Sequence, residues 1–254
     1  MTEPSSPKVL AVIPARYAST RFPGKVIAPL AGRPLVAHVY DRARAARLVR
    51  DTVVAVDDTR VAEVLQAHGV PYVHTRPDHP SGTDRMAEVA EKRDADILVN
   101  VQGDEPLMDP ATIDRAIEPL LADPELVMAT ARRRITDPAL VADPDVVKVV
   151  CDEGGRALYF SRHPIPYVRD GTGEGSPHWQ HIGLYVYRRD FLLKYAAMPP
   201  SPLESLEKLE QLRVLENGYT ISVVETDYES IGVDTPADLE RAAAYLRQRQ
   251  EGSC

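Results

Sequence analysis

Short apolar runs alternate with amphipathic stretches along the first half of the chain. Strands are predicted at Val9 to Ile13, Thr52 to Val56, Tyr72 to His74, Ile97 to Val101 and Val127 to Ala131. Helical spacing of apolar residues is found between them, at Leu35 to Ala46, Arg60 to His68, Asp84 to Arg93 and Ala111 to Leu121. Because helices that alternate with buried strands connect parallel neighbours, the pattern predicts an α/β fold with a mainly parallel sheet covered on both faces.

The pattern changes in the second half, where strand-like segments follow one another without a helix between them. These segments are Val146 to Asp152, Ala157 to Phe160 and Gly183 to Tyr187. They predict a smaller antiparallel excursion, at about 155–190, from one domain spanning 1–254. It holds much of the chain's aromatic content, as Tyr159, Phe160, Tyr167, Trp179, Tyr185 and Tyr187. Two interpretations stay open: a substrate wall or subunit contact, and a satellite core.

Leu203 to Leu215 is predicted as an amphipathic helix near the end of the chain. Its core stripe would contain Leu206, Leu209 and Leu212, which leaves Glu210 and Gln211 facing solvent by pattern alone. A strand at Ile221 to Glu225 and a helix at Ala237 to Gln248 complete the chain.

Fixed cations gather in a small-residue loop directly after the first strand. Pro14 is expected to end the strand, and Ala15, Ala18, Ser19 and Gly24 leave the loop backbone open to an anion. Arg16, Arg21 and Lys25 supply positive charge. Such a cluster suits phosphoryl or nucleotidyl transfer, because positioned cations stabilise the transition states of both. The alternative is a solvated basic loop. Neither G-x-x-x-x-G-K-[ST] nor G-x-G-x-x-G occurs in the chain, so the commoner phosphate-binding loops are excluded.

Composition limits the remaining classes. A formal net charge of −8 argues against a nucleic-acid-binding surface, which needs a basic face, but is compatible with a free nucleotide in a local basic pocket. No apolar run approaches a membrane span, and the polar first residues do not resemble a signal peptide. Cys151 and Cys254 offer no disulfide framework, which fits a reducing cytoplasm.

Two aspartates are candidate ligands of a divalent cation. Asp104 follows the strand at Ile97 to Val101 and should emerge at the same edge of the sheet as the cationic loop. Mg²⁺ is bound by one or two carboxylates plus substrate phosphates, although Gly103 and Asp104 also suit a simple turn. Asp234 is the second candidate, because the capping box that follows it uses Thr235 and Asp238.

Further candidates lie on a helix start and a strand. Ser81 and Asp84 match a capping box, and the exposed N–H groups of such a helix start, with Gly82, can receive a base edge or an anion. Arg76 adds a cation to this loop. His181 is expected on the same strand face as Tyr185, where it can hydrogen-bond a polar substrate. His178 and His181 lack the spacing of a zinc pair.

These residues fall in ordered motifs that resemble the 3-deoxy-manno-octulosonate (KDO) cytidylyltransferase family. The motifs are I-P-A-R-Y-A-S-T-R-F-P-G-K, H-P-S-G-T-D-R, V-N-V-Q-G-D-E-P, H-I-G-L-Y, L-E-Q-L-R and V-D-T-P-A-D-L. The likeness runs from about Lys8 to Leu246. It departs from the commoner family form at Phe22, Val26 and Pro80, where no charged or metal-binding group is lost.

The resemblance implies a Rossmann-like fold of the nucleotidyltransferase type and the reaction CTP + KDO → CMP-KDO + pyrophosphate, a step toward lipopolysaccharide. It implies catalytic roles for Arg16, Lys25 and Asp104. By motif position, CTP would contact Ala15, Arg16, Arg21, Lys25, Arg76, Ser81, Gly82 and Gln102. The sugar would contact Gln102, Arg162, His181, Tyr185, Glu210 and Gln211, which overrides the solvent-facing interpretation of the last two. Asp104 and Asp234 would hold Mg²⁺, and the excursion would form a homodimer contact.

Two other functions remain as alternatives. A cytidylyltransferase for another sugar acid would share these motifs, and turnover of different acids would distinguish it. A non-catalytic nucleotide-binding relative would be expected to have lost a metal ligand or a phosphate-binding cation, and here both are present.

Overall fold

In the computed structural model, which describes residues 6–18, 22–170, 177–229 and 231–251, the chain divides into two units. The first unit comprises 1–114 with 230–254, and the second comprises 115–229. That the two units form one domain over 1–254 stays a prediction.

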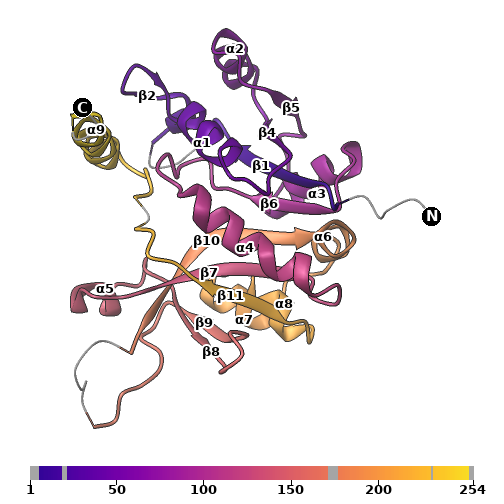
Figure 1. Ribbon diagram of the computed structural model, residues 1–254, viewed down its shortest axis with the longest axis vertical. Helices are drawn as coiled ribbons and strands as arrows, with labels where there is room; N and C mark the ends of the chain where they lie inside the picture. The colour runs from indigo at the N-terminus through magenta and orange to yellow at the C-terminus, as the bar shows by residue number, and fades with distance from the viewer. Residues whose placement is uncertain (1–5, 19–21, 171–176, 230, 252–254) are drawn as a thin grey trace. The chain divides into compact units, whose positions relative to one another are not determined.

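Four parallel strands form the sheet of the first unit (Figure 1). Their order is β6 (Ile97–Asn100), β1 (Val9–Ala15), β4 (Asp51–Val56) and β5 (Tyr72–His74). Every residue of β6 is buried, and so is every residue of β4 after the first. Since successive strand residues face opposite sides, both faces of the sheet are covered, as predicted.

Helices follow each of these strands along the chain, the one after β5 beginning beyond a loop. They are α1 (Leu35–Arg44), α2 (Thr59–Ala67), α3 (Gly82–Lys92) and α4 (Pro110–Ala122), which continues into the second unit. The short elements η1 (Lys25–Ile27), β2 (Pro29–Leu30) and β3 (Arg33–Pro34) follow the cationic loop. Ser81 caps α3 with the predicted capping box. The C-terminal helix α9 (Pro236–Glu251) returns to this unit and packs near β2.

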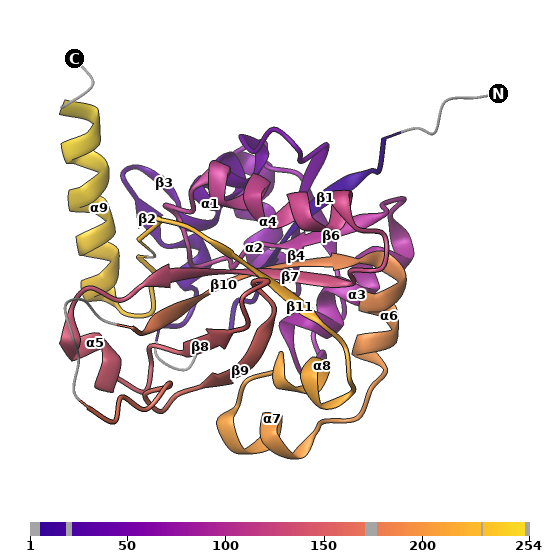
Figure 2. The same ribbon diagram turned by 60° about the horizontal axis from the view of Figure 1, so that its bottom comes forward.

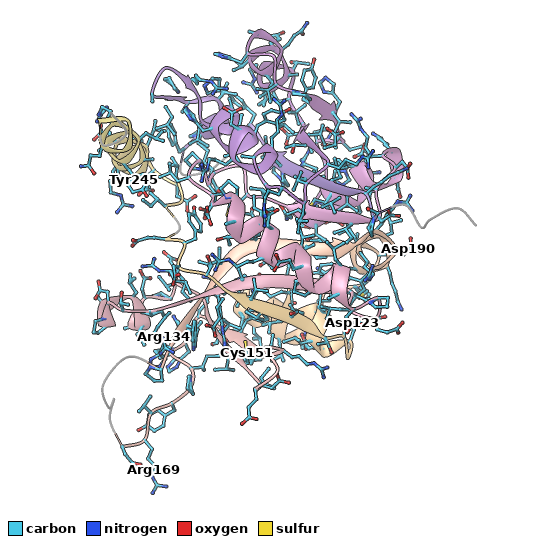
Figure 3. All side chains as sticks on the ribbon, viewed as in Figure 1. Asp123, Arg134, Cys151, Arg169, Asp190 and Tyr245 are labelled. Atoms are coloured by element: carbon cyan, nitrogen blue, oxygen red, sulfur yellow. The ribbon has the colours of Figure 1, made fainter. Side chains whose placement is uncertain are left out.

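The second unit contains a mixed sheet (Figure 2). Its strands are β7 (Met128–Arg134), β8 (Lys148–Cys151), β9 (Ala157–Ser161), β10 (Trp179–Arg188) and β11 (Ile221–Glu225). β7 pairs parallel with β11 and antiparallel with β10. β8 pairs antiparallel with both β9 and β10, which confirms the predicted antiparallel excursion. Cys151, the cysteine labelled in Figure 3, ends β8 as a free thiol.

Four short helices complete the second unit: α5 (Pro138–Ala142), α6 (Arg189–Ala196), α7 (Pro202–Glu207) and α8 (Leu212–Glu216). The single helix predicted over Leu203 to Leu215 is wrong, because Lys208 adopts a left-handed backbone conformation with φ of 55° between α7 and α8. Leu206 is 79% exposed and does not belong to a core stripe, whereas Leu209 and Leu212 are buried.

Some aromatic residues of the excursion fit a satellite core, and another fits a substrate wall or subunit contact. Phe160 and Tyr187 are buried in the core of the second unit, as a satellite core would have them. Tyr167 is 87% exposed, as a contact surface would have it. The excursion therefore has both an interior and an exposed aromatic side chain.

Strand β1 extends further than the sequence predicted. Pro14 does not end it, since Pro14 and Ala15 still pair in register with Ala55 and Val56 of β4. Pairing with β6 ends at Val12 and Asn100. The proline is tolerated because the ladder on its β6 side has already ended and no longer needs its missing N–H.

Candidate functional site

The ammonium group of Lys25 lies between two aspartates that are far apart in the sequence. Its Nζ is 2.7 Å from Oδ2 of Asp104 and 2.8 Å from Oδ1 of Asp234. Lys25 begins η1 after the cationic loop, Asp104 follows β6, and Asp234 precedes α9. All three belong to the first unit, and their ion pairs bring them together; their roles in a reaction stay predictions.

Backbone contacts at the carboxyl ends of β1 and β6 build this cluster. Gly103 approaches β1 so closely that a Cβ atom there would lie 2.5 Å from the carbonyl oxygen of Pro14. The next residue, Asp104, accepts a hydrogen bond at its own carbonyl oxygen from the N–H of Val233, at 2.9 Å. The strand-end turn therefore holds the segment that carries Asp234 in place.

The capping box that starts α9 also contributes. Oδ2 of Asp238 accepts the N–H groups of Asp234 and Thr235, at 3.0 and 2.8 Å, and Oγ1 of Thr235 accepts the N–H of Asp238. The predicted box of Thr235 and Asp238 is confirmed, and Asp234 keeps its carboxylate for Lys25.

The electrostatics favour a charged cluster. Burial alone would lower the pKa of Lys25, but the charges and hydrogen bonds of Asp104 and Asp234 outweigh it and raise that pKa. Two carboxylate oxygens from different segments face one nitrogen, and such hard oxygen donors suit Mg²⁺. Within the described residues no group of three or more His, Cys, Asp or Glu is arranged for a metal. A cation bound here would therefore take its other ligands from substrate or water.

Three other nucleotide candidates lie at the carboxyl ends of β1 and β6. Ala15 ends β1 and is buried, and Arg16 follows it with a partly buried side chain. Gln102 is partly buried between β6 and Asp104. Arg21 lies outside the described residues.

The loop before α3 carries the other three nucleotide candidates. Arg76 is exposed, and its backbone N–H donates to Glu88 at 2.9 Å. The Ser81 hydroxyl donates to Asp84 at 2.6 Å within the capping box. Gly82 faces open space where a side chain would stand. In the described part of the chain, the hydrogen bonds of Arg76 and Ser81 go to α3 and not to Lys25.

In the second unit, the predicted sugar-binding residues His181, Tyr185 and Gln211 come together. The rings of His181 and Tyr185 have centroids 5.4 Å apart, and the Tyr185 hydroxyl donates to Oε1 of Gln211 at 3.2 Å. Gln211 is only 3% exposed, and its Nε2 has no hydrogen-bond partner among the described residues. A buried amide donor without a partner is costly, so this atom is suited to a substrate oxygen.

Burial sets the protonation of this group. It lowers the pKa of His181 to about 3, and it raises the pKa of Tyr185, with Glu210 adding to the rise. The Thr130 hydroxyl donates its one proton to the backbone oxygen of Leu184, at 2.7 Å. Its oxygen therefore accepts a hydrogen bond from Nε2 of His181, at 2.9 Å. The neutral imidazole thereby presents Nδ1 as an acceptor.

Two other sugar candidates lie differently. Arg162 donates from Nε to the backbone oxygen of Glu207, at 2.8 Å, and from Nη1 to that of Pro144, at 2.9 Å. These two hydrogen bonds hold Arg162 to the backbone and not to His181, Tyr185 or Gln211. Glu210 is partly buried and its backbone oxygen accepts the Tyr195 hydroxyl at 2.6 Å.

The solvent-facing interpretation from helical pattern was wrong for Gln211 and incomplete for Glu210. The turn between α7 and α8 directs Gln211 inward, where a continuous helix would have placed it outward.

Sequence reasoning missed the residues that hold these candidates in place. Asp57 accepts the backbone N–H of Tyr17 in the cationic loop, at 3.1 Å, and Thr130 holds His181. Glu207 accepts the backbone N–H of Arg162, at 2.9 Å, and the hydroxyl of Ser161. Asp57 follows strand β4 as Asp104 follows β6, and this position was the available signal. Thr130 and Glu207 carried none.

Comparisons with known proteins fit this arrangement. The family model described as Cytidylyltransferase matches residues 10–226, which include Lys25 and Asp104. The 3-deoxy-manno-octulosonate cytidylyltransferase of Solibacter usitatus is 56% identical over 94% of this chain and 95% of its own length. That of Geobacter metallireducens is 55% identical over 96% of this chain and 99% of its own length.

A solved structure of CMP:2-keto-3-deoxy-manno-octonic acid synthetase, complexed with CTP, is also similar. It matches with a TM-score of 0.90 and 44% sequence identity, and the match covers 95% of this chain and 99% of the chain in that structure. The fold and site are those of a nucleotidyltransferase. The chain belongs to the cytidylyltransferase family and, within it, to the 3-deoxy-manno-octulosonate cytidylyltransferases. No helix among the described residues is long and apolar enough to span a membrane.

Proposed function

We propose that the protein transfers the cytidylyl group of CTP to the anomeric hydroxyl of KDO, giving CMP-KDO and pyrophosphate for lipopolysaccharide biosynthesis. The names of the relatives support both substrates, and the related structure complexed with CTP supports the nucleotide. Within this chain, the observation that carries the proposal is the meeting of Lys25 with Asp104 and Asp234.

The first unit would bind CTP. Lys25 uses two of its three N–H donors on the carboxylates, so the third can donate to a phosphate oxygen. Arg16 and Arg21 add fixed charge from the same loop, and backbone groups of Ala15 line it. The loop before α3 would receive the cytidine through Arg76, Ser81 and Gly82. Gln102 lies beside Asp104 and would contact both substrates.

Asp104 and Asp234 would hold Mg²⁺, because their oxygens already converge and substrate phosphates can complete the coordination. When bound, Mg²⁺ would neutralise phosphate charge and lower the pKa of the attacking hydroxyl.

The second unit would bind KDO. Nε2 of Gln211 would donate to a sugar oxygen, Nδ1 of His181 would accept a sugar hydroxyl, and Arg162 and Glu210 would contact the remaining polar groups. Tyr185 would stay a neutral phenol, since burial raises its pKa. Neutral polar groups of this kind recognise hydroxyls without taking part in proton transfer.

In the reaction, the anomeric hydroxyl of KDO gives up its proton to solvent, and its oxygen forms a bond to the α-phosphorus of CTP. The bond from that phosphorus to the bridging oxygen of the β-phosphate breaks, and pyrophosphate leaves with the electron pair. Arg16 and Lys25 would stabilise the charge that develops on the phosphate oxygens. No covalent enzyme intermediate is needed.

Two further properties belong to this proposal. A homodimer through the antiparallel excursion is supported by the exposed side chains of Leu158 and Tyr167, since exposed large apolar groups favour a contact surface. A cytoplasmic location follows from the proposed use of CTP. Size measurement of the wild type and of Tyr167→Ser by light scattering would test the dimer, and a monomeric wild type would contradict it.

Pyrophosphate release with CTP and Mg²⁺ tests the reaction against a panel of keto-sugar acids: KDO, an amino-substituted KDO and a sialic acid. We expect turnover with KDO that exceeds the others. Preference for another acid would correct the substrate, and CTP binding without pyrophosphate release from any acid would indicate a non-catalytic relative. Asp104→Asn is the inactive control.

A further inference from the structure

A fully buried arginine lies near the cationic loop and has no role in the reaction described above. Arg85, on α3, is 0% exposed. Its Nη2 is 3.1 Å from Oδ2 of Asp57, and its Nη1 donates to the hydroxyl of Thr75. A buried ion pair of this kind is weak as a source of stability, because desolvation offsets the attraction.

The carboxylate of Asp57 links this arginine to the loop. Its second oxygen, Oδ1, accepts the backbone N–H of Tyr17 at 3.1 Å. Tyr17 directly follows Arg16, whose positive charge is near enough to act on the Arg85 guanidinium. The Asp57 carboxylate thus contacts α3 with one oxygen and the cationic loop with the other.

Tyr17 carries the contact onward to Lys25. Its carbonyl oxygen accepts the N–H of Gly24 at 2.9 Å, and Gly24 precedes Lys25. Gly24 has a φ of 71°, and a Cβ atom there would meet the Tyr17 ring at 3.2 Å. The guanidinium of Arg60 covers the ring, 3.5 Å from its centroid. Hydrogen bonds and close packing therefore connect Arg85, Asp57, Tyr17 and Gly24 in sequence.

We propose that Asp57 and Arg85 are positioning residues for CTP binding: together they fix the backbone of Tyr17, and through it the places of Arg16 and Lys25. The pair touches no substrate. This inference rests on the proposed function for its ligand, but not for its geometry. A displacement of about 1 Å in such groups costs on the order of 100-fold in rate.

Hydrogen exchange of the substrate-free protein tests the geometry alone. In Asp57→Ala, the amide protons of Tyr17 and Gly24 should exchange at least about 10-fold faster than in the wild type. Asp114→Ala is a matched control, because Asp114 is also buried and accepts backbone N–H groups, from Arg47 at 3.1 Å and Leu48 at 2.8 Å. It should leave Tyr17 and Gly24 protected. Unchanged exchange in Asp57→Ala would overturn the proposal.

Kinetics test the consequence for the ligand. Asp57→Ala and Arg85→Met should raise KM for CTP about 10-fold or more and leave KM for KDO within about twofold. Arg85→Lys should recover part of the loss, since it restores the charge but not the fork. Asp114→Ala should lower the melting temperature without this split. Equal changes in both KM values, or the same split in Asp114→Ala, would overturn the proposal.

A double variant separates the pair from two independent effects. Asp57→Ala with Arg85→Met should be no worse than the poorer single variant, because each change already breaks the same chain of contacts. Additive losses would contradict a shared role. If Arg85→Met does not fold, Asp57→Ala and Arg85→Lys still decide the question. If the wild type fails to use CTP, the proposed function fails while the exchange result stands by itself.

Discussion

At the scale of single residues, Lys25 joins two carboxylates that are far apart in the sequence. The contact requires Asp104 and Asp234 to keep both their charge and their position. An amide in place of one carboxylate preserves the size of the side chain but removes the negative charge that Lys25 and a divalent cation need. Substitutions here should therefore affect chemistry far more than folding.

Asp104→Asn should lower the rate of pyrophosphate release by about 100-fold to 1,000-fold, as loss of a preorganised charged group in a transition state does. Asp109→Asn is the matched control, because Asp109 lies in the same segment and caps the start of α4 by accepting the Thr112 N–H at 3.0 Å. Asparagine caps a helix about as well as aspartate. Wild-type activity in Asp104→Asn would remove its assigned role.

Gly103→Ala should destabilise the protein by roughly 1–3 kcal/mol, because the added carbon would stand 2.5 Å from the Pro14 oxygen and force the two strand ends apart. Gly232→Ala, whose added carbon would be 3.7 Å from Glu105, should cost far less. Urea unfolding of both variants measures the difference. Equal stability would show that β1 and β6 separate easily.

At the scale of elements, a cluster of hydrogen bonds attaches the loop before α3 to the helix. Burial would raise the pKa of Glu88, but hydrogen bonds from Lys92, the backbone N–H of Arg76 and His79 outweigh it and lower that pKa to about 2. The unfolded chain therefore takes up this proton at higher pH than the folded one.

This stabilisation should be complete above pH 4.5 and be lost as the pH falls from 4.5 through about 2. Glu88→Gln should lower the free energy of unfolding at neutral pH and flatten its dependence on pH in this window. Glu91→Gln, at an exposed position of the same helix, should do neither. Urea unfolding at several pH values measures both, and an unchanged slope in Glu88→Gln would contradict the assignment.

The elements also show what the sequence could predict. The strands of the first unit could be predicted because they are short runs between polar turns, and β5 has the predicted bounds, as does β11 of the second unit. The break between α7 and α8 was missed, because the leucine spacing suits one helix. Side-chain contacts between the two helices stabilise the break instead: Arg213 pairs with Glu204, and Ser201 donates to Glu216.

The same distinction holds for the candidate site. Asp104 and Asp234 could be predicted because local structure does not explain their carboxylates: Asp104 follows a strand, and Asp234 lies beside a capping box that does not use it. Asp57 and Thr130 could not, since their roles depend on Tyr17 and His181, and no local pattern announces those contacts. Sequence identified the groups that carry charge, and the structure added those that hold them.

At the scale of the whole molecule, the nucleotide candidates belong to the first unit, and every sugar candidate except Gln102 belongs to the second. Ligand protection should follow this division. CTP with Mg²⁺ should slow hydrogen exchange at residues 14–18, 76–85 and 102–105. KDO should slow it at 181–185 and 209–213. Exchange measured by mass spectrometry tests this, and protection by CTP confined to the second unit would contradict the assignment.

The contacts of Lys25 with two carboxylates also determine how the protein responds to chelators. Because the Lys25 ammonium already neutralises Asp104 and Asp234, the segments that carry them are held together without bound Mg²⁺. EDTA should abolish turnover yet leave the melting temperature unchanged in wild type, whereas in Lys25→Ala added magnesium should raise it. An enzyme built in this way would survive magnesium starvation intact and resume work when the ion returns.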